Sequence, residues 1–309
     1  MNYQLLALDM DGTSLTSEKV ISPGTKAAIH AALKEGKDVF FATGRAPVEM
    51  EEHLRHFPEM RYVMYLSGAI VRDRVTGEDL HNVHIPLHIV EKIMEIAGKS
   101  SALVAVYASD GVFVEKTKRG HMDEYGCQCF EPLYEQCATW VEDLEEIAFD
   151  PGRKIHKVNF YCGSEADWLA CAEALRKLPV SYASGFPNNE EISPLGVDKG
   201  KALCAMCEKL GIPVSQAIAV GDQSNDLSMI HMAGLGVAMG NATEEVKAAA
   251  DVVTDDCDHD GVAKVIEEYL ASPWGGKLSP KVTDEGASLQ KGGSGTEKKC
   301  HKRRAPIVV

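Results

Sequence analysis

Two aspartates follow the first apolar segment of the chain and restrict what this region can form. Residues 5–8 are all apolar, which predicts a buried strand, and Asp9, Met10, Asp11 and Gly12 come directly after it. Side chains two positions apart in a strand share a face, so the two carboxylates would converge beyond the strand, where Gly12 lets the backbone turn. This convergence is unfavourable unless a cation or a proton lies between them. An Asp-Gly turn explains the dipeptide equally well when it is taken alone.

The size of the chain predicts a globular protein with a substantial core. Its 309 residues are 45% hydrophobic, which allows one large or two medium domains. No apolar run approaches the roughly 20 residues that cross a bilayer, and the first residues lead into a strand instead of a basic and apolar signal segment. We therefore expect a cytoplasmic protein without a membrane partner.

Charge and cysteine content narrow the functional classes. The formal net charge of −14 argues against a nucleic-acid or anionic-membrane partner for the main body. A phosphate substrate would then require a metal ion and a few placed cations to reverse the local field. The nine cysteines are scattered and odd in number, which favours small buried side chains over a disulfide framework. The pairs Cys127/Cys129 and Cys204/Cys207 lack a second pair at zinc-finger spacing, so a metal or redox role is the weaker alternative.

The first 70 residues alternate between strand and helix patterns. Strands are expected at residues 4–8, 38–42 and 62–66, and helices at residues 23–35 and 47–56. This βαβαβ order predicts an α/β fold built on a doubly wound parallel sheet of the Rossmann-like type.

A different texture begins near residue 84. Hairpin-like strands and two helices are expected there, which predicts an inserted α+β segment. From residue 198 the alternation of strand and helix patterns returns. The segments before and after the insertion would therefore contribute strands to one sheet. Expected strands lie at 102–107, 112–115, 154–162, 217–220, 236–239 and 252–254, and expected helices at 86–99, 165–177, 198–210, from 225, from 243 and up to 270. Residues 272–309 are rich in glycine and then basic, which predicts a disordered tail, with a nucleic-acid or membrane-surface anchor as the alternative.

Other reactive side chains lie at the ends of further expected strands. Thr43, Gly44 and Arg45 follow the second strand, so the Thr43 hydroxyl and the two following amides would point from a helix N-terminus toward an anion. Lys199 opens a helix and would bring an ammonium to the same place, although a solvated lysine explains it when taken alone.

The segment Gly221–Asp226 follows another expected strand. It supplies Asp222 as a third carboxylate at a strand end, together with the amide of Asn225 and the acid of Asp226. Residues of these types also cap helices, so the segment is ambiguous by itself.

Together these motifs resemble those of the haloacid dehalogenase superfamily of aspartate-nucleophile phosphatases. The four motifs of that family correspond, in order, to residues 9–13, Thr43, Lys199 and residues 221–226. Later stretches resemble its Cof-type, subclass IIB branch, in which a large α/β cap is inserted between the second and third motifs. The resemblance covers residues 2–270, and the stretches that carry the subgroup likeness are 235–242, 244–247 and 260–263. It implies a core of residues 1–83 and 190–271 and a cap of residues 84–189.

The resemblance also implies a mechanism. Asp9 would attack phosphorus and form an aspartyl-phosphate, while Mg²⁺ is held by Asp9, the backbone carbonyl of Asp11 and Asp222. The side chain of Asp11 would stay free, protonate the leaving alcohol and later deprotonate water. Phosphate would be bound by Thr43, Gly44, Arg45, Lys199 and Asn225, with Asp226 orienting phosphate or metal-bound water from behind.

The expected substrate is a small phosphorylated metabolite such as a sugar phosphate, because a large cap would exclude macromolecules, nucleic acids included. A phosphomutase or phosphotransferase of the same fold and a binding module without turnover are the alternatives. Ser67-Gly68-Ala69 departs from the usual Asn-Gly-Ala, which would alter a polar contact near the cap hinge, and Ser14 replaces a more usual apolar residue. Candidate substrate contacts in the cap, each also explained as a solvated loop residue, are Arg119, His121, Asn188 and Glu190. The sequence gives no signal of oligomeric state.

Overall fold

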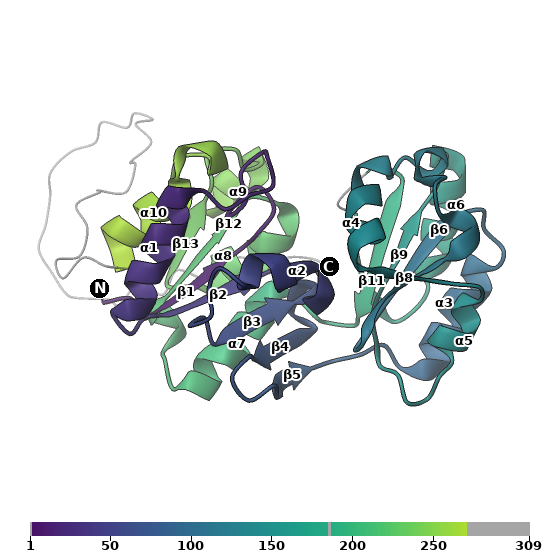
Figure 1. Ribbon diagram of the computed structural model, residues 1–309, viewed down its shortest axis with the longest axis horizontal. Coiled ribbons are helices and arrows are strands. Elements are labelled where there is room, and N and C mark those ends of the chain that lie inside the picture. Colours follow the sequence, from purple (N-terminus) through teal and green to yellow (C-terminus); the bar gives the residue numbers. More distant parts are fainter. Residues whose placement is uncertain (1, 185–186, 271–309) are drawn as a thin grey trace, which may run out of the picture. The chain divides into compact units, whose positions relative to one another are not determined.

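The computed structural model describes residues 2–184 and 187–270, and these form two β-sheets (Figure 1). The main sheet has the strand order β14-β13-β12-β1-β2-β3-β4-β5. The strands from β14 to β3 run parallel, and β4 and β5 add an antiparallel hairpin at one edge. These strands are β1 (Leu5–Leu8), β2 (Asp38–Ala42), β3 (Tyr62–Tyr65), β4 (Ile70–Asp73), β5 (Asp79–Asn82), β12 (Ala217–Gly221), β13 (Leu235–Ala238) and β14 (Val252–Val253).

Helices cover both faces of the main sheet because both faces of its strands are apolar. In β1, Leu6 and Leu8 pack into one buried cluster, whereas Leu5 and Ala7 belong to a second cluster with the helix that follows residue 198. This alternation is what a doubly wound sheet requires. The helices are α1 (Pro23–Lys34), α2 (Pro47–Leu54), α7 (Lys199–Leu210), α8 (Leu227–Met232), α9 (Glu244–Ala249) and α10 (Gly261–Val265), the last continued by a π-helix at Ile266–Leu270.

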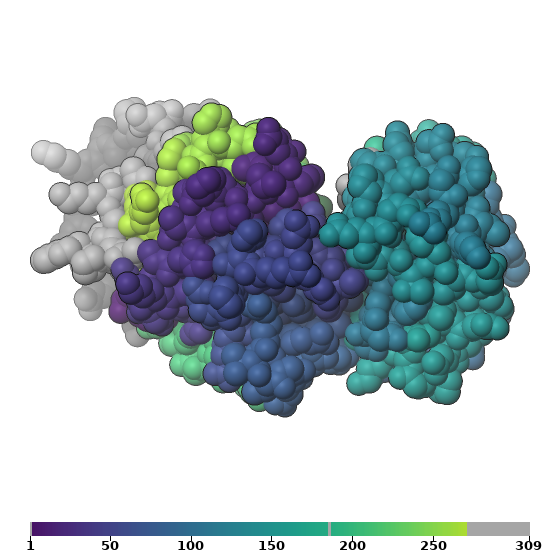
Figure 2. All heavy atoms as spheres, viewed as in Figure 1, coloured from purple at the N-terminus to yellow at the C-terminus, as the bar shows by residue number. Residues whose placement is uncertain are grey.

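The two ends of the described chain build this body together. α1 contacts α10, and the surface coloured for the first residues adjoins the surface coloured for residues near 260 (Figure 2). Local signals define the helix ends: the Ser22 side chain accepts from the Thr25 amide at 3.0 Å, Pro23 occupies the first turn, and Gly36 follows the helix with a φ of 78°.

The inserted segment forms the second sheet, in the order β10-β11-β9-β6-β7-β8, in which only β7 and β8 pair in parallel. Three of its helices, α3, α5 and α6, pack over one apolar face. Its elements are α3 (Leu87–Ala97), β6 (Leu103–Ala108), β7 (Gly111–Glu115), α4 (Glu131–Cys137), β8 (Ala138–Val141), α5 (Leu144–Ala148), β9 (Ile155–Tyr161), α6 (Glu165–Leu175), β10 (Val180–Ala183) and β11 (Asn189–Pro194).

The predicted fold class, a doubly wound mostly parallel sheet with an inserted α+β segment, is confirmed. The tail predicted at residues 272–309 lies outside the described residues. Within residues 2–184 and 187–270, no helix combines the length and apolar composition needed to cross a membrane. The eight cysteines of the described part are all free, and four of them are buried.

Candidate active site

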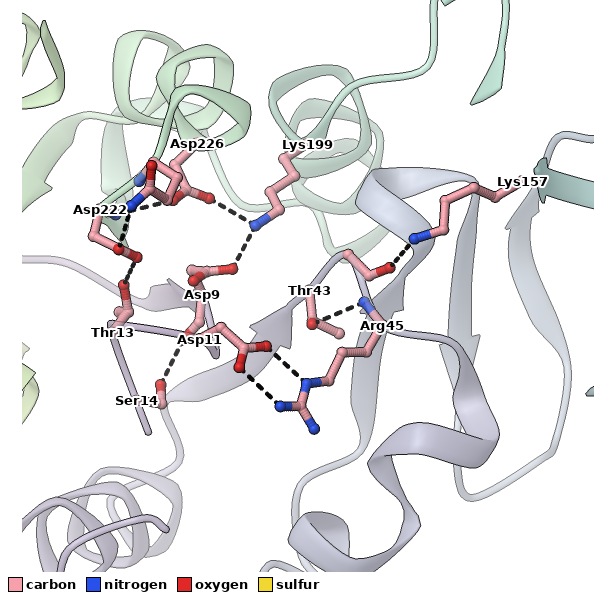
Figure 3. A network of polar contacts seen from close by, with 12 residues as sticks. Asp9, Asp11, Thr13, Ser14, Thr43, Arg45, Lys157, Lys199, Asp222 and Asp226 are labelled. Carbon is pink, nitrogen blue, oxygen red and sulfur yellow. Dashed lines mark hydrogen bonds and ion pairs between the residues drawn. The ribbon is translucent and has the colours of Figure 1, made fainter. Parts of the chain in front are cut away.

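Asp9 lies directly after β1 and faces the start of α7. It is 6% exposed, and its Oδ1 atom is 2.5 Å from Lys199 Nζ. Lys199 is fully buried and also lies 2.6 Å from Asp226 Oδ1 (Figure 3). The ammonium is therefore held between two buried carboxylates that are far from it in sequence.

Asp222 and Asp226 are placed by the turn that follows β12. Asp226 Oδ2 accepts from the amides of Asp222 at 2.9 Å and Gln223 at 3.0 Å, which fixes the turn. Thr13 Oγ1 donates to Asp222 Oδ1 at 2.9 Å. Gly12 allows this approach, because a Cβ there would lie 2.4 Å from the Asp222 carboxylate and its φ is 78°.

Oxygen atoms of Asp9, Asp222 and Asp226 lie within 4.8 Å of one another, and all three residues are buried. Burial, followed by the charge of Asp226, raises the pKa of Asp9 well above its usual range and that of Asp222 to about 6. Burial opposes the charge on Lys199, but the two acids beside it outweigh burial and raise its pKa. Carboxylate oxygens are the ligands of hard divalent cations, so this group is a candidate metal site.

The side chain of Asp11 forms ion pairs that the sequence did not predict. Arg45 donates to it through two nitrogens at 2.7 and 2.8 Å, and Lys19 Nζ lies 3.0 Å from its Oδ1 atom. Burial would raise the pKa of Asp11, but the hydrogen bonds and charge of Arg45, assisted by Lys19, hold it well below its usual range. The Asp11 side chain therefore lies outside the group of three acids, as the anion of an ion pair.

The loop after β2 supplies two groups for anion binding. Thr43 Oγ1 accepts from the Arg45 amide at 3.1 Å, so the Thr43 hydroxyl proton can point to a ligand. The Arg45 amide is thus already used within the protein. In the described part of the chain the Gly44 amide has no recorded acceptor, which leaves it available to an anion.

The family is decided by comparison with known proteins. A family model described as haloacid dehalogenase-like hydrolase matches residues 6–266. The chain belongs to the haloacid dehalogenase-like hydrolase family. The structure of the subclass IIB sugar phosphatase BT4131 shares the fold, with a TM-score of 0.72 at 23% identity, covering 85% of this chain and 98% of that chain.

Relatives of this haloacid dehalogenase-like hydrolase cover most of its length. The 5-amino-6-(5-phospho-D-ribitylamino)uracil phosphatase YcsE of Bacillus subtilis is 30% identical over 275 residues, covering 87% of this chain and 97% of that protein. An HMP-PP phosphatase of Yersinia pseudotuberculosis is 27% identical over 275 residues, covering 88% and 97%. A crystal structure of a haloacid dehalogenase-like hydrolase from Bacteroides thetaiotaomicron matches with a TM-score of 0.76 at 27% identity, covering 86% of this chain and 99% of that chain.

The remaining predicted residues of this hydrolase are Asn225 and four residues of the inserted segment. Asn225 is exposed in the short 3₁₀ helix Ser224–Asp226, and its side chain has no recorded partner in the described residues. Arg119 is paired with Glu135, with its Nε atom 2.8 Å from Oε1.

The other three candidates in the inserted segment are also engaged or shaped by their surroundings. His121 lies 3.1 Å from Glu124, and Asn188 has a left-handed φ of 54°. Glu190 is not a loop residue as expected: it lies in β11, is fully buried and pairs with Arg176 at 3.1 Å. Glu190 therefore connects β11 with α6 and the residue after it, within the inserted segment.

Sequence reasoning missed residues that brace the site. Asn241 donates to the Gly12 carbonyl at 2.8 Å and accepts from the Cys257 amide at 3.0 Å, which ties the loop after β1 to the end of the main sheet. Lys157 of β9 donates to the Gly44 carbonyl at 3.1 Å. The only sequence signal for Asn241 was its place in the stretch that resembles the subgroup, and Lys157 had none.

Proposed function

We propose that this protein is a Mg²⁺-dependent phosphatase that hydrolyses a small phosphomonoester through an aspartyl-phosphate on Asp9. The observation that carries the proposal is the convergence of Asp9, Asp222 and Lys199 at the carboxyl ends of β1 and β12. Nucleophile, metal ligands and a balancing cation thus occupy one edge of a parallel sheet, where α/β proteins bind ligands.

In the first step the Asp9 carboxylate attacks phosphorus and the bond from phosphorus to the leaving oxygen breaks. Lys199 neutralises charge on Asp9, and the Thr43 hydroxyl and Gly44 amide hold phosphoryl oxygens. Asp11 gives a proton to the leaving alcohol, then takes one from the water that cleaves the aspartyl-phosphate. When bound by Asp9, the Asp11 carbonyl and Asp222, Mg²⁺ would screen the repulsion between the two anions.

Two ion pairs at the site bear on how substrate would bind. Asp226 Oδ1 is bound to Lys199 and its Oδ2 accepts two amide hydrogens, which suits an indirect role behind the metal ligands. Asp11 must leave the Arg45 guanidinium before it can carry a proton. An incoming phosphate competes with Asp11 for Arg45, which supports the predicted contact of Arg45 with substrate.

The substrate class follows from the relatives in part only. Their names give different compounds at nearly the same identity, so the protein's own substrate is a small phosphorylated metabolite, with a sugar phosphate as our specific proposal. We assign residues 1–83 and 190–271 to the catalytic core and residues 84–189 to the cap. A cytoplasmic location and the absence of a nucleic-acid partner stay predictions.

The test is a screen of phosphorylated metabolites and p-nitrophenyl phosphate with the purified protein in Mg²⁺. We expect release of inorganic phosphate, loss of activity with a chelator and recovery on addition of Mg²⁺. Asp9→Asn serves as the blank, and Asp123→Asn, at an exposed position, is the matched control that should retain activity. Isomerised product without free phosphate would establish a mutase instead, and no turnover of any ester would contradict the proposal.

A further inference from the structure

Lys157 is a buried lysine that the proposed chemistry does not use. It lies on β9, the strand between β11 and β6, and is 5% exposed. A buried ammonium is unfavourable unless it is paired and hydrogen-bonded. Its Nζ atom donates to the Gly44 carbonyl at 3.1 Å, lies 3.4 Å from Glu191 Oε2 and lies 4.4 Å from the centre of the Tyr107 ring (Figure 3 shows the Gly44 contact).

The hydrogen bond to the Gly44 carbonyl differs from the neighbouring ones in the loop after β2. The neighbouring peptide groups of this loop bond to the main sheet and the turn after β3: the Thr43 amide to Met64, the Thr43 carbonyl to the Ser67 amide and the Arg45 carbonyl to the Leu66 amide. Within the described residues, the recorded donor to the Gly44 carbonyl is Lys157 alone. The carbonyl end of the peptide that joins Gly44 to Arg45 is therefore held from the second sheet.

That peptide connects Lys157 to Thr43. Its carbonyl accepts from Lys157, and its N–H, on Arg45, donates to Thr43 Oγ1 at 3.1 Å. Hydrogen bonds in such a chain polarise and strengthen one another. One acceptor site of the Thr43 oxygen is then filled, which leaves its proton available to a ligand.

We infer that Lys157 is a positioning residue that acts through the Gly44–Arg45 peptide on the Thr43 hydroxyl, so the second sheet contributes to the phosphoryl-binding site. This inference rests on the function proposed above. It deepens that function because it couples an element of the inserted segment to the loop that holds the reacting group.

The charges around Lys157 give it a structural role beside the proposed positioning role. Glu49 of α2 is 8% exposed and its Oε2 accepts from the Ala46 amide at 2.5 Å. Burial raises the pKa of Glu49, and Lys157 acts against that rise. Lys157 thus also balances the charges of Glu49 and Glu191, so its removal affects stability. A test therefore has to measure the contribution of the Thr43 hydroxyl to activity as well.

The test compares Lys157→Met, Lys157→Arg and Lys154→Met in the full-length protein with p-nitrophenyl phosphate and Mg²⁺. Lys154 is exposed just before β9 and serves as the matched control. We expect Lys157→Met to lower kcat/KM by about tenfold, Lys157→Arg to restore most of it, and Lys154→Met to have no effect.

Lys157→Met in a Thr43→Val background tests whether Lys157 acts through the Thr43 hydroxyl. There Lys157→Met should lower kcat/KM by less than about twofold, because the hydroxyl on which Lys157 acts is gone. An equal loss in both backgrounds, or no loss in the wild-type background, would overturn the inference.

Folding and function are kept apart by two further measurements. If Lys157→Met does not fold, Lys157→Gln, which keeps a donor without the charge, replaces it in the same double-mutant cycle and is judged by the same outcomes. If the wild-type protein hydrolyses no phosphomonoester, the proposed function fails first. If the wild-type protein hydrolyses phosphomonoesters and the Lys157 variants have the same kcat/KM, only the inference about Lys157 fails.

Discussion

The two sheets place their polar residues in different ways. In the main sheet, Asp9, Thr43 and Asp222 each lie at the carboxyl end of a parallel strand, so they meet at one edge. In the second sheet, polar side chains lie along one face of the antiparallel strands. Tyr107 of β6, Asn159 and Tyr161 of β9 and Tyr134 of the covering helix α4 hydrogen-bond to one another there, with the hydroxyls of Tyr107 and Tyr134 2.9 Å apart.

This difference suggests that the main sheet carries the reactive side chains, whereas the second sheet carries side chains that stabilise the fold or position other groups. Parallel strands share a direction, so residues distant in sequence gather at a common edge and react with one ligand. Antiparallel strands offer no such common end, and their buried polar groups stabilise or position instead. Changes in the main sheet should therefore alter metal-dependent chemistry, while changes in the second sheet should alter stability or fine positioning.

The largest expected effect on stability is that of Lys199→Met in the main sheet. Removal of the ammonium leaves Asp9 and Asp226 buried without their partner, so the unfolding free energy should fall by about 3–5 kcal/mol. Mg²⁺ should reduce the loss. Urea unfolding with and without Mg²⁺ measures both effects. Lys201→Met, on the exposed side of the same helix, should cost under about 1 kcal/mol, and equal losses in the two variants would contradict the account.

Asp11→Asn should divide substrates by their leaving groups. An amide cannot donate or take the proton, so hydrolysis of alkyl phosphates should slow by about 10²-fold or more, whereas p-nitrophenyl phosphate, whose leaving group needs little protonation, should slow much less. Steady-state kinetics on both substrates measure the ratio. If both substrates lose the same factor, Asp11 is not the acid.

His156 tests the second sheet through pH. Burial, followed by the charge of His84, lowers the pKa of His156 from 6.5 to about 4. The unfolded chain therefore binds this proton first, and the unfolding free energy should fall by about 3 kcal/mol as the pH drops from 6.5 to about 4. His156→Gln should remove that part of the pH dependence, and the exposed His88→Gln should not. Urea unfolding across this pH range measures the effect. The same dependence of unfolding free energy on pH in the wild type and both variants would contradict the assignment to His156.

The smallest expected effect is that of Ser67→Asn. Ser67 has φ 54° and ψ 30°, a left-handed conformation that asparagine adopts more readily than serine. The unfolding free energy should therefore rise by up to about 1 kcal/mol with unchanged Mg²⁺ dependence. Thermal unfolding measures the gain, with the exposed Ser101→Asn as control. A loss of stability would show that the serine hydroxyl matters more than the backbone.

The elements of the main sheet were predictable because their patterns are local. β2 spans the predicted residues 38–42, and the helix from Pro23 ends one residue before its predicted limit. The hairpin of β4 and β5 was not predicted, because Arg72 and Asp79 interrupt its apolar pattern and pair only across the two strands. Its identity depends on a partner that the sequence does not show.

The candidate site was predictable to the same degree. Asp9, Asp222 and Lys199 were predicted to meet, because each follows or precedes an element of a parallel sheet, and the structure brings them together. The ion pair of Arg45 with Asp11 was missed, because it depends on where a long side chain ends in space. The Lys157 contact was missed for the same reason, and its partner lies 113 residues away.

The most direct test of the account is to stop the reaction with acid in the steady state and locate the phosphoryl group by mass analysis of peptides. A phosphorylated peptide that contains Asp9 is expected in the wild-type protein. No adduct is expected in a folded Asp9→Asn protein, whose turnover should fall by about 10⁴-fold or more. Undiminished turnover by Asp9→Asn, or a phosphoryl group on a different residue, would contradict the claim that this edge of the main sheet carries the nucleophile.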